Sequence, residues 1–191
     1  LAAAWIELLD ETLGELRPVS AAGLDVKKWP LPIVNINGDL RRNGVILEAL
    51  RTSRVATSED IQTDERTKGL HKHLGKFEFH SLASIPFQLH GKTIGVLNLL
   101  SGEVGWFRDE EEIRLLDEMG RDISFALDAL ENEKVKRQWE QALREGEEKM
   151  RSIFRAAPTG IGVVKDRVLL DVNSRICEMT GYAKEELIGQ S

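Results

Sequence analysis

The sequence is poor in cysteine: Cys177 is the only one in 191 residues. One thiol cannot form a disulfide within the chain, and it cannot build a zinc site from several cysteines. Such low cysteine usage fits a reducing compartment. We therefore expect a cytoplasmic protein that is held together by a hydrophobic core, for which its 41% hydrophobic residues suffice.

Long apolar runs and a basic surplus are also missing. No run approaches the roughly 18 residues that cross a bilayer, and no charged and then apolar leader opens the chain. The 26 Lys and Arg are outnumbered by 32 Asp and Glu, which gives a net charge of −6. Binding to nucleic acid needs the opposite balance, because basic side chains neutralise phosphates. We expect a soluble acidic protein with no nucleic-acid partner and no membrane segment.

The common catalytic motifs are absent as well. The sequence contains no Gly-rich phosphate loop, no GxSxG elbow and no HExxH. The acidic run from Asp109 to Glu112 fits the solvated first turn of a helix, where the helix dipole favours negative charge. We therefore expect no catalytic residues and no enzymatic activity in this fragment.

Three histidines, His71, His73 and His80, lie within ten positions and raise the question of metal or haem ligation. His71 and His73 are two residues apart, so on a helix they would point to different faces. No cysteine or carboxylate accompanies them at a recognisable ligand spacing. We expect surface or core histidines and no metal site.

Two segments show the pattern of β-hairpins. Apolar runs on either side of a turn at Gly14 predict a hairpin over residues 2–21, in which Pro18 argues against a central second strand. The segment AAAWIELL taken alone could equally form a helix. Alternation over 81–89 and 93–100, joined by His90-Gly91-Lys92, predicts an antiparallel pair.

The sequence between the hairpins is less regular. We expect a helix over 44–51 with Asn43 as its cap, a brief strand over 54–57, and one short helix within the polar stretch 60–79.

A long helix is predicted from Asp109 to Ala156, which would measure about 70 Å unless Gly146 bends it. Ion pairs four residues apart, such as Glu133 with Arg137, support it. Apolar residues recur at steps of three and four, and the phase slips near Lys134. We expect a homodimer to form through this helix, parallel or antiparallel, with its contact at Leu116, Ile123, Leu127 and Leu130.

Beyond Pro158 the pattern predicts strands over 161–164 and 168–172, then a helix capped by Asn173 or Ser174. These elements indicate that a second domain begins here. The chain opens on Leu1 and stops at Ser191 just after an expected helix, so we expect it to be a piece of a longer protein.

The order of motifs resembles a GAF domain over about residues 1–130. The most specific part is the succession IPF at 85–87, GKTIGVLNL at 91–99, and then Phe107, the acidic run and Leu115-Leu116. The resemblance implies an α+β fold with a central antiparallel sheet flanked by helices. GAF domains usually open with a helix before the first strand, so that helix is expected to be missing here or supplied by a partner chain.

The last part resembles the start of a PAS domain, through SIFRAAPTGI at 152–161, DVNS at 171–174 and MTGY at 179–182. We expect a GAF-like domain at 1–130, a helical linker at 131–157 and a truncated PAS-like segment at 158–191. The resemblance implies a sensory module of a multidomain signalling protein, whose output would be a histidine kinase or a diguanylate cyclase. The alternative is a ligand-free dimerisation and spacer module.

A GAF-like sheet implies a concavity above its central strands, an apolar pocket with a few polar groups. The residues expected to line it could equally be core. They are Trp5, Leu24, Trp29, Leu31, Ile33, Phe77, Phe79, Ile85 and Asn98.

The sequence leaves the cofactor unknown. Bilin attachment and cysteine-based reduction of methionine sulfoxide, both found in GAF-like proteins, are excluded because the GAF-like region has no cysteine. A cyclic nucleotide is not expected, since Phe107, Asp109 and Glu110 match the end of that pattern without the Asn-Lys pair before it. Haem is not expected either.

Overall fold

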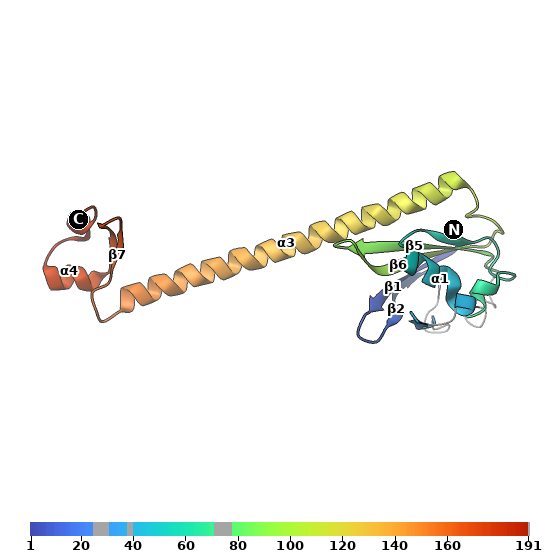
Figure 1. Cartoon of the computed structure of the whole chain (residues 1–191), viewed down its shortest axis with the longest axis horizontal. Helices are drawn as coiled ribbons and strands as arrows, with labels where there is room; N and C mark the ends of the chain where they lie inside the picture. The colour runs from blue at the N-terminus through green and yellow to red at the C-terminus, as the bar shows by residue number, and fades with distance from the viewer. Residues whose placement is uncertain (25–30, 38–39, 71–77, 191) are drawn as a thin grey trace. The chain divides into compact units, whose positions relative to one another are not determined.

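A computed structural model describes residues 1–24, 31–37, 40–70 and 78–190, with the side chains of 40–43 left out. The chain divides into two compact units, Leu1–Glu131 and Asn132–Ser191. The first unit holds a six-stranded antiparallel sheet in the order β3-β2-β1-β6-β5-β4 (Figure 1). Its strands are β1 (Ala3–Asp10), β2 (Glu15–Ala22), β3 (Val34–Asn35), β4 (Ala56–Ser58), β5 (Ser81–Leu89) and β6 (Lys92–Ser101).

The predicted N-terminal hairpin is confirmed as β1 and β2, and the helical alternative for AAAWIELL is wrong. The Asp10 carboxylate accepts hydrogen bonds from the backbone N–H groups of Thr12 and Leu13, which closes the turn before Gly14. On its other side β2 pairs with β3 only at Glu15 and Leu16. Pro18 lies opposite β1 beside a β-bulge, a position that suits a residue without an N–H.

The second predicted hairpin is confirmed as β5 and β6. Its two-residue turn, His90-Gly91, has positive φ at both positions, as a tight hairpin turn requires.

Helix α1 (Leu40–Thr52) begins four residues before the predicted start, so Asn43 lies inside the helix and the predicted cap is wrong. Leu40, Arg41 and Arg42 have high helix propensity, which explains the longer element. The brief strand is found as β4, two residues later than predicted, and a 3-10 helix, η1 (Glu65–Thr67), lies in the polar stretch.

The sheet separates two apolar clusters. One lies on the inner face, the name used here for the face that α1 covers. The other lies on the outer face, which packs against the first turns of α3 (Figure 1). Both faces of β5 are therefore buried, and this strand contributes to both clusters.

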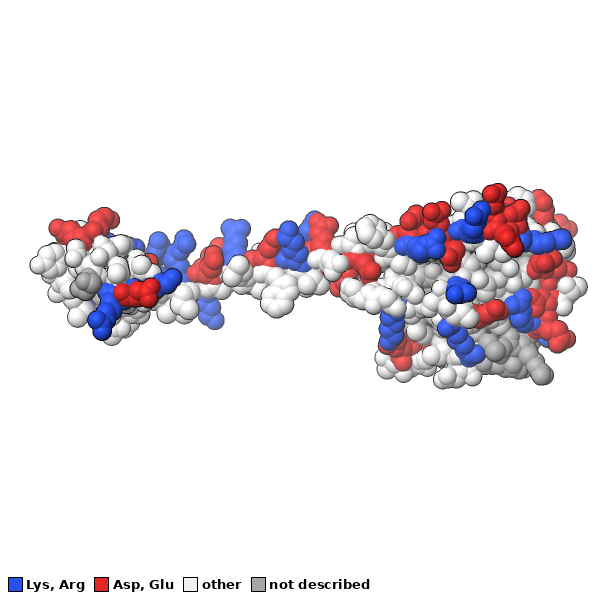
Figure 2. Space-filling view, turned by 45° about the horizontal axis from the view of Figure 1, so that its top comes forward, with Lys and Arg blue, Asp and Glu red and all other residues white. Residues whose placement is uncertain are grey.

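Helix α3 (Glu110–Ala156) is continuous over 47 residues, as predicted, and Gly146 does not interrupt it. The Asp109 carboxylate caps its first turn by accepting a hydrogen bond from the N–H of Glu111. Ion pairs four residues apart line its surface, including the predicted pair of Glu133 and Arg137. Figure 2 shows both signs of charge along this helix, with uncharged surface between them.

The second unit carries the predicted strands and helix, which are β7 (Gly162–Lys165), β8 (Val168–Val172) and α4 (Ser174–Thr180). A further short helix, α5 (Lys184–Leu187), was not predicted. Of the two predicted caps for α4, Asn173 is the one used, since its side chain accepts from the N–H of Ile176. Cys177 is a half-buried free thiol on α4. Over the part of the chain that the structure describes, no helix has the length and apolar character needed to cross a membrane.

Candidate functional site

A row of three buried side chains crosses the inner face on the central strands. Trp5 of β1 is directly opposite Asn98 of β6, which is directly opposite Ser84 of β5. Residues that pair directly across strands share one face, so all three point toward α1. Each of them is fully buried.

A chain of hydrogen bonds connects this row to a buried acid. The Ser84 hydroxyl donates to Asn98 Oδ1 over 2.6 Å, and Asn98 Nδ2 donates to Glu7 Oε2 over 2.9 Å. Glu7 follows Trp5 by two positions on β1, so the strand places both on the inner face. Its exposed fraction is 0%, which is uncommon for a glutamate.

The electrostatics of Glu7 follow from its burial, which raises the pKa of its carboxyl to about 8. Hydrogen bonds from Asn98 and, more weakly, from the Trp5 indole act in the opposite direction. Most copies of Glu7 are consequently protonated at pH 7.

Two polar atoms beside this chain belong to neighbouring side chains on β1. Among the residues that the structure describes, Glu7 Oε1 and Trp5 Nε1 meet no partner with full hydrogen-bond geometry, and the Trp5 indole acts as a weak donor to the Glu7 carboxyl. Buried polar groups are nearly always paired, and here the acid and the indole partly satisfy each other.

The structure brings together several of the predicted pocket residues. Trp5 and Phe79 belong to the inner cluster, Leu24 and Leu31 pack against it partly exposed, and Asn98 lies in the row described above. Trp29 and Phe77 lie outside the described residues.

Two predicted pocket residues lie elsewhere. Ile85 follows Ser84 on β5, so strand alternation turns it to the outer face, where it packs with Ala83, Leu99 and Phe107. Ile33 is 54% exposed, and its neighbour Val34 is the buried residue.

Glu7 and Ser84 were missed by the sequence analysis. The signal for Glu7 was its spacing of two residues from Trp5 inside an apolar strand, which places a charged residue on the buried face. Ser84 could have been found by the same alternation once the register of β5 with β6 was known.

Of the three histidines that were predicted to be surface or core residues, the structure describes only His80, because His71 and His73 lie outside the described residues. His80 Nδ1 lies 3.3 Å from the carboxylate of Asp60. Within the described ranges, no three His, Cys, Asp or Glu side chains are grouped as metal ligands.

The outer face of β5 is where α3 packs. A Cβ at Gly120 would lie 2.8 Å from the Pro86 carbonyl oxygen and 3.0 Å from a methyl group of Ile85, so glycine permits a close approach. Further along α3, the hydroxyl of Ser124 accepts from the N–H of Gln88 over 2.8 Å. The Asp128 carboxylate accepts from the N–H of His90 over 2.7 Å.

This packing occupies part of the face on which the dimer contact was predicted. Leu116 packs against the outer cluster, and Ile123 and Leu127 are half-buried, while Leu130 is 64% exposed. Four other large apolar side chains on α3 are exposed, and they follow one another at spacings of four, seven and three residues. They are Trp139, Leu143, Met150 and Ile153.

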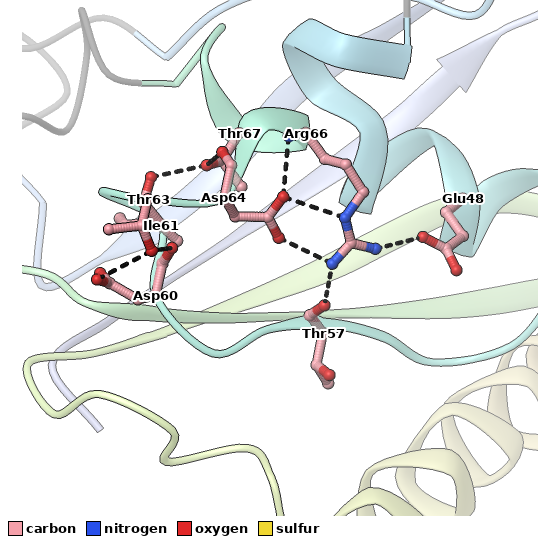
Figure 3. A network of polar contacts seen from close by, with 8 residues as sticks. All are labelled: Glu48, Thr57, Asp60, Ile61, Thr63, Asp64, Arg66 and Thr67. Carbon is pink, nitrogen blue, oxygen red and sulfur yellow. Dashed lines mark hydrogen bonds and ion pairs between the residues drawn. The ribbon is translucent and has the colours of Figure 1, made fainter.

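A separate polar network fastens η1 to the rest of the first unit (Figure 3). Arg66 pairs with Asp64 over 2.8 Å and with Glu48 of α1 over 2.7 Å, and it donates to the carbonyl of Thr57 over 2.9 Å. Partial burial tends to raise the pKa of the Asp64 carboxyl, yet the hydrogen bonds from Arg66 hold that pKa below its usual value. With its guanidinium engaged by three residues, Arg66 has a structural role, which the sequence analysis missed.

Residues 1–128 match the family model of the GAF domain. The chain belongs to the GAF domain family. Residues 148–191 match the model of the PAS fold. Both domains point to a sensory or regulatory module, and the mixed α+β fold of the GAF domain is confirmed.

Solved structures share the fold of the GAF domain. A domain of a putative two-component sensor histidine kinase from Sinorhizobium meliloti is 19% identical, covers 71% of this chain and 84% of its own, and has a TM-score of 0.54. The GAF domain region of a putative membrane protein from Geobacter sulfurreducens is 24% identical, covers 68% and 82%, and has a TM-score of 0.51.

Some of the similar structures are enzymes. The type II free methionine-R-sulfoxide reductase of Thermoplasma acidophilum is 16% identical, covers 65% of this chain and 77% of its own, and has a TM-score of 0.49. No curated protein matches the chain.

Proposed function

We propose that the GAF domain binds a small ligand at the inner face of its sheet and transmits the binding event through β5 to α3. One observation carries this proposal: consecutive residues of β5 contact the candidate site and the helix. Ser84 bonds to Asn98 on the inner face, and Ile85 and Pro86 meet Gly120 of α3 on the outer face.

The helix side of this contact is extended and regular. Gly120, Ser124 and Asp128 are four residues apart, so they lie along one face of α3. Each of them meets β5 or the turn that follows it. A small shift of β5 therefore acts on two turns of α3 together.

We further propose that α3 pairs with α3 of a second copy through the exposed set Trp139, Leu143, Met150 and Ile153. These large apolar side chains are more than half exposed among the described residues, and helix pairing would remove them from water. The boundaries proposed are 1–130 for the GAF domain, 131–157 for the linker and 158–191 for the PAS segment. A histidine kinase or a diguanylate cyclase would be the output in a cytoplasmic signalling protein.

The energy required is modest. A ligand shifts a balance between two helix states only through its differential affinity for them, and a hundredfold preference corresponds to about 2.7 kcal/mol. That preference would reverse a balance in which the two states differ about tenfold in population.

A spacer without a ligand is the second candidate. It is favoured by the tight packing of the inner face, where Trp5, Leu82 and Leu100 are fully buried by the chain itself. In that case Glu7 and Asn98 would be core residues that fix the register of the central strands.

The two functions are separated by native mass spectrometry of gently purified protein, followed by a thermal-shift screen of metabolites. Our proposal predicts a bound or stabilising small molecule. It also predicts that this molecule slows hydrogen exchange at the N–H groups of Gln88 and His90, which bond to α3. A protein that gains no stability from any fraction of a cell extract would be a spacer.

A further inference from the structure

Glu7 has no charged neighbour across the sheet. Its direct partners are Pro18 on β2 and Val96 on β6, and neither carries a charge. Strand β5, which follows β6 in the sheet, contains no charged residue. Among the described residues of these strands, none on the inner face balances a change in the charge of the Glu7 carboxyl.

The charged side chains described on the surrounding strands and on α1 have partners of their own. These are Arg17 with Glu15, Lys92 with Glu11, Glu48 with Arg66, Arg51 with the carbonyl of Ile36, and Asp10 with the amides of Thr12 and Leu13. Within the part of the chain that the structure describes, the Glu7 carboxyl therefore interacts with two neutral donors, Asn98 and the Trp5 indole.

Ionisation changes the strength of the bond from Asn98. Asn98 Nδ2 donates to Glu7 Oε2 over 2.9 Å, and this hydrogen bond becomes charge-assisted when the carboxyl loses its proton. Charge-assisted hydrogen bonds are shorter than neutral ones and about twice as strong. Asn98 also accepts from Ser84, so a movement of Asn98 toward Glu7 pulls on β5. The charge of one residue on β1 therefore acts on two further strands.

The contact of β5 with α3 leaves no free space to absorb such a movement. Ser84 is followed by Ile85 and Pro86, and a Cβ at Gly120 would lie only 2.8 Å from the Pro86 carbonyl oxygen. Met119, the residue before Gly120, packs in the same outer cluster as Ile85. Closely packed interiors transmit displacements, so a shift of β5 reaches α3.

Resting on the coupling of β5 to α3 proposed above, we propose that Glu7 makes α3 respond to pH: loss of the Glu7 proton pulls Asn98 toward β1 and changes how β5 packs against α3. The O–H bond of the carboxyl breaks, its electron pair stays on the carboxylate, and the proton goes to the solvent. No other covalent bond forms or breaks. Alkalinity would then be a second input to the domain, besides the ligand of the proposed function.

The range in which this input acts follows from the burial of Glu7. Because burial raises the pKa of its carboxyl to about 8, the carboxyl is mostly neutral at about pH 7 and mostly ionised at about pH 9. The packing of β5 against α3 should therefore change between these two values.

Carbon-13 NMR follows the acid and the helix in one titration from pH 6 to pH 10. The carboxyl carbon of Glu7 reports its own ionisation, and the methyl groups of Ile85, Leu116 and Met119 report the packing of β5 against α3. Methyl signals are used because amide protons exchange rapidly with water in alkaline solution. We expect the methyl signals to shift with the same midpoint as the Glu7 carboxyl, at about pH 8.

Two variants test the acid. Glu7→Gln keeps an acceptor for Asn98 and cannot ionise, so the methyl shifts should disappear. Every other titrating group remains in this variant, so the shift that it loses belongs to Glu7. Glu11→Gln removes an exposed acid on the same hairpin and should keep the methyl shifts in full. Circular dichroism confirms that each variant folds.

A third variant tests the path through Asn98. Ser84→Ala leaves Glu7 and Asn98 in place and removes the hydrogen bond to β5. The Glu7 carboxyl should still titrate in this variant, while the methyl shifts should fall by half or more. Full methyl shifts in a folded Ser84→Ala variant would overturn the proposed path.

Methyl signals on α3 that stay in place while the Glu7 carboxyl titrates would overturn the inference, and this result needs no variant. Equal methyl shifts in a folded Glu7→Gln variant would overturn it too, as would a Glu7 carboxyl that does not titrate in this range. The coupling is tested separately at a constant pH of 7. If Ser84→Ala moves the α3 methyl signals there, the coupling stands and only the response to pH fails. If it does not, the proposed coupling fails as well.

Discussion

At the scale of single residues, Glu7 is the most informative side chain in the GAF domain. Its carboxyl is fully buried, accepts a hydrogen bond from Asn98, and belongs to a strand that the sequence marks as apolar. Sequence reasoning found its neighbours Trp5 and Asn98 but passed over Glu7, because an acidic residue on a β-strand is usually solvated. Only the pairing of β1 with β6 shows that Asn98 reaches it.

Glu7 makes stability depend on pH. The pKa of its carboxyl rises from 4.5 to about 8 on folding, so the folded protein binds the extra proton between these values. Its stabilising contribution is complete below about pH 4.5 and is lost as the pH rises through 8. The free energy of unfolding should fall by at most about 1.4 kcal/mol per pH unit over this range.

Urea denaturation from pH 5 to pH 9 measures this effect. In Glu7→Gln the fall should disappear, because the amide does not titrate. Glu11→Gln, which removes an exposed acid on the same hairpin, is the control and should retain the wild-type slope of stability against pH. Parallel curves for the wild type and Glu7→Gln would show that Glu7 does not carry the shifted titration.

At the scale of elements, the contact between β5 and α3 is set by one glycine. A methyl group at Gly120 would meet the Pro86 carbonyl, which is backbone and cannot move aside without shifting the strand. Gly120→Ala should therefore lower the free energy of unfolding of the first unit by about 1–3 kcal/mol, despite the better helix propensity of alanine.

Gly146→Ala is the matched control on the same helix. A Cβ there meets nothing within 4 Å, so this variant should leave the first unit as stable as the wild type and raise helicity slightly. Chemical denaturation followed by circular dichroism distinguishes the two glycines. Equal changes in the free energy of unfolding at both positions would mean that helix propensity alone determines them, and that β5 and α3 are not closely packed.

Local patterns predicted most of these elements. Alternation identified both hairpins, and the spacing of apolar and charged residues identified α3 almost to the residue. The sequence could not say which side of α3 faces its own sheet, because Leu116 and Trp139 are equally apolar. It likewise assigned Ile85 to the pocket, since both faces of β5 are buried and its two serines, Ser81 and Ser84, lie on opposite faces, so no polar alternation separates the two sides.

At the scale of the whole molecule, the exposed apolar side chains of α3 form the surface through which we propose that two copies of the chain associate. Trp139 and Leu143 are four residues apart and are both more than half exposed. Replacing Leu143 and Met150 together with Asp should convert a dimer into a monomer, because two charges would then lie in the helix contact. Sedimentation equilibrium measures the change.

Leu130→Asp is the control, since at about 100° per residue Leu130 projects from the side of α3 opposite to Trp139. It also tests the dimer contact predicted from the sequence, which included Leu130. A dimer that survives the double substitution, or one that Leu130→Asp dissociates equally well, would contradict pairing through the exposed set.

The central claim is that β5 couples the inner face of the sheet to α3. Amide NMR of Ser84→Ala tests it most directly, with Ser81→Ala as the control, because Ser81 lies on the same strand and bonds to the carbonyl of Glu103 instead. We predict that Ser84→Ala shifts the signals of Gln88, His90, Gly120 and Ser124, while Ser81→Ala leaves them in place. Unchanged α3 signals in a folded Ser84→Ala variant would contradict the coupling.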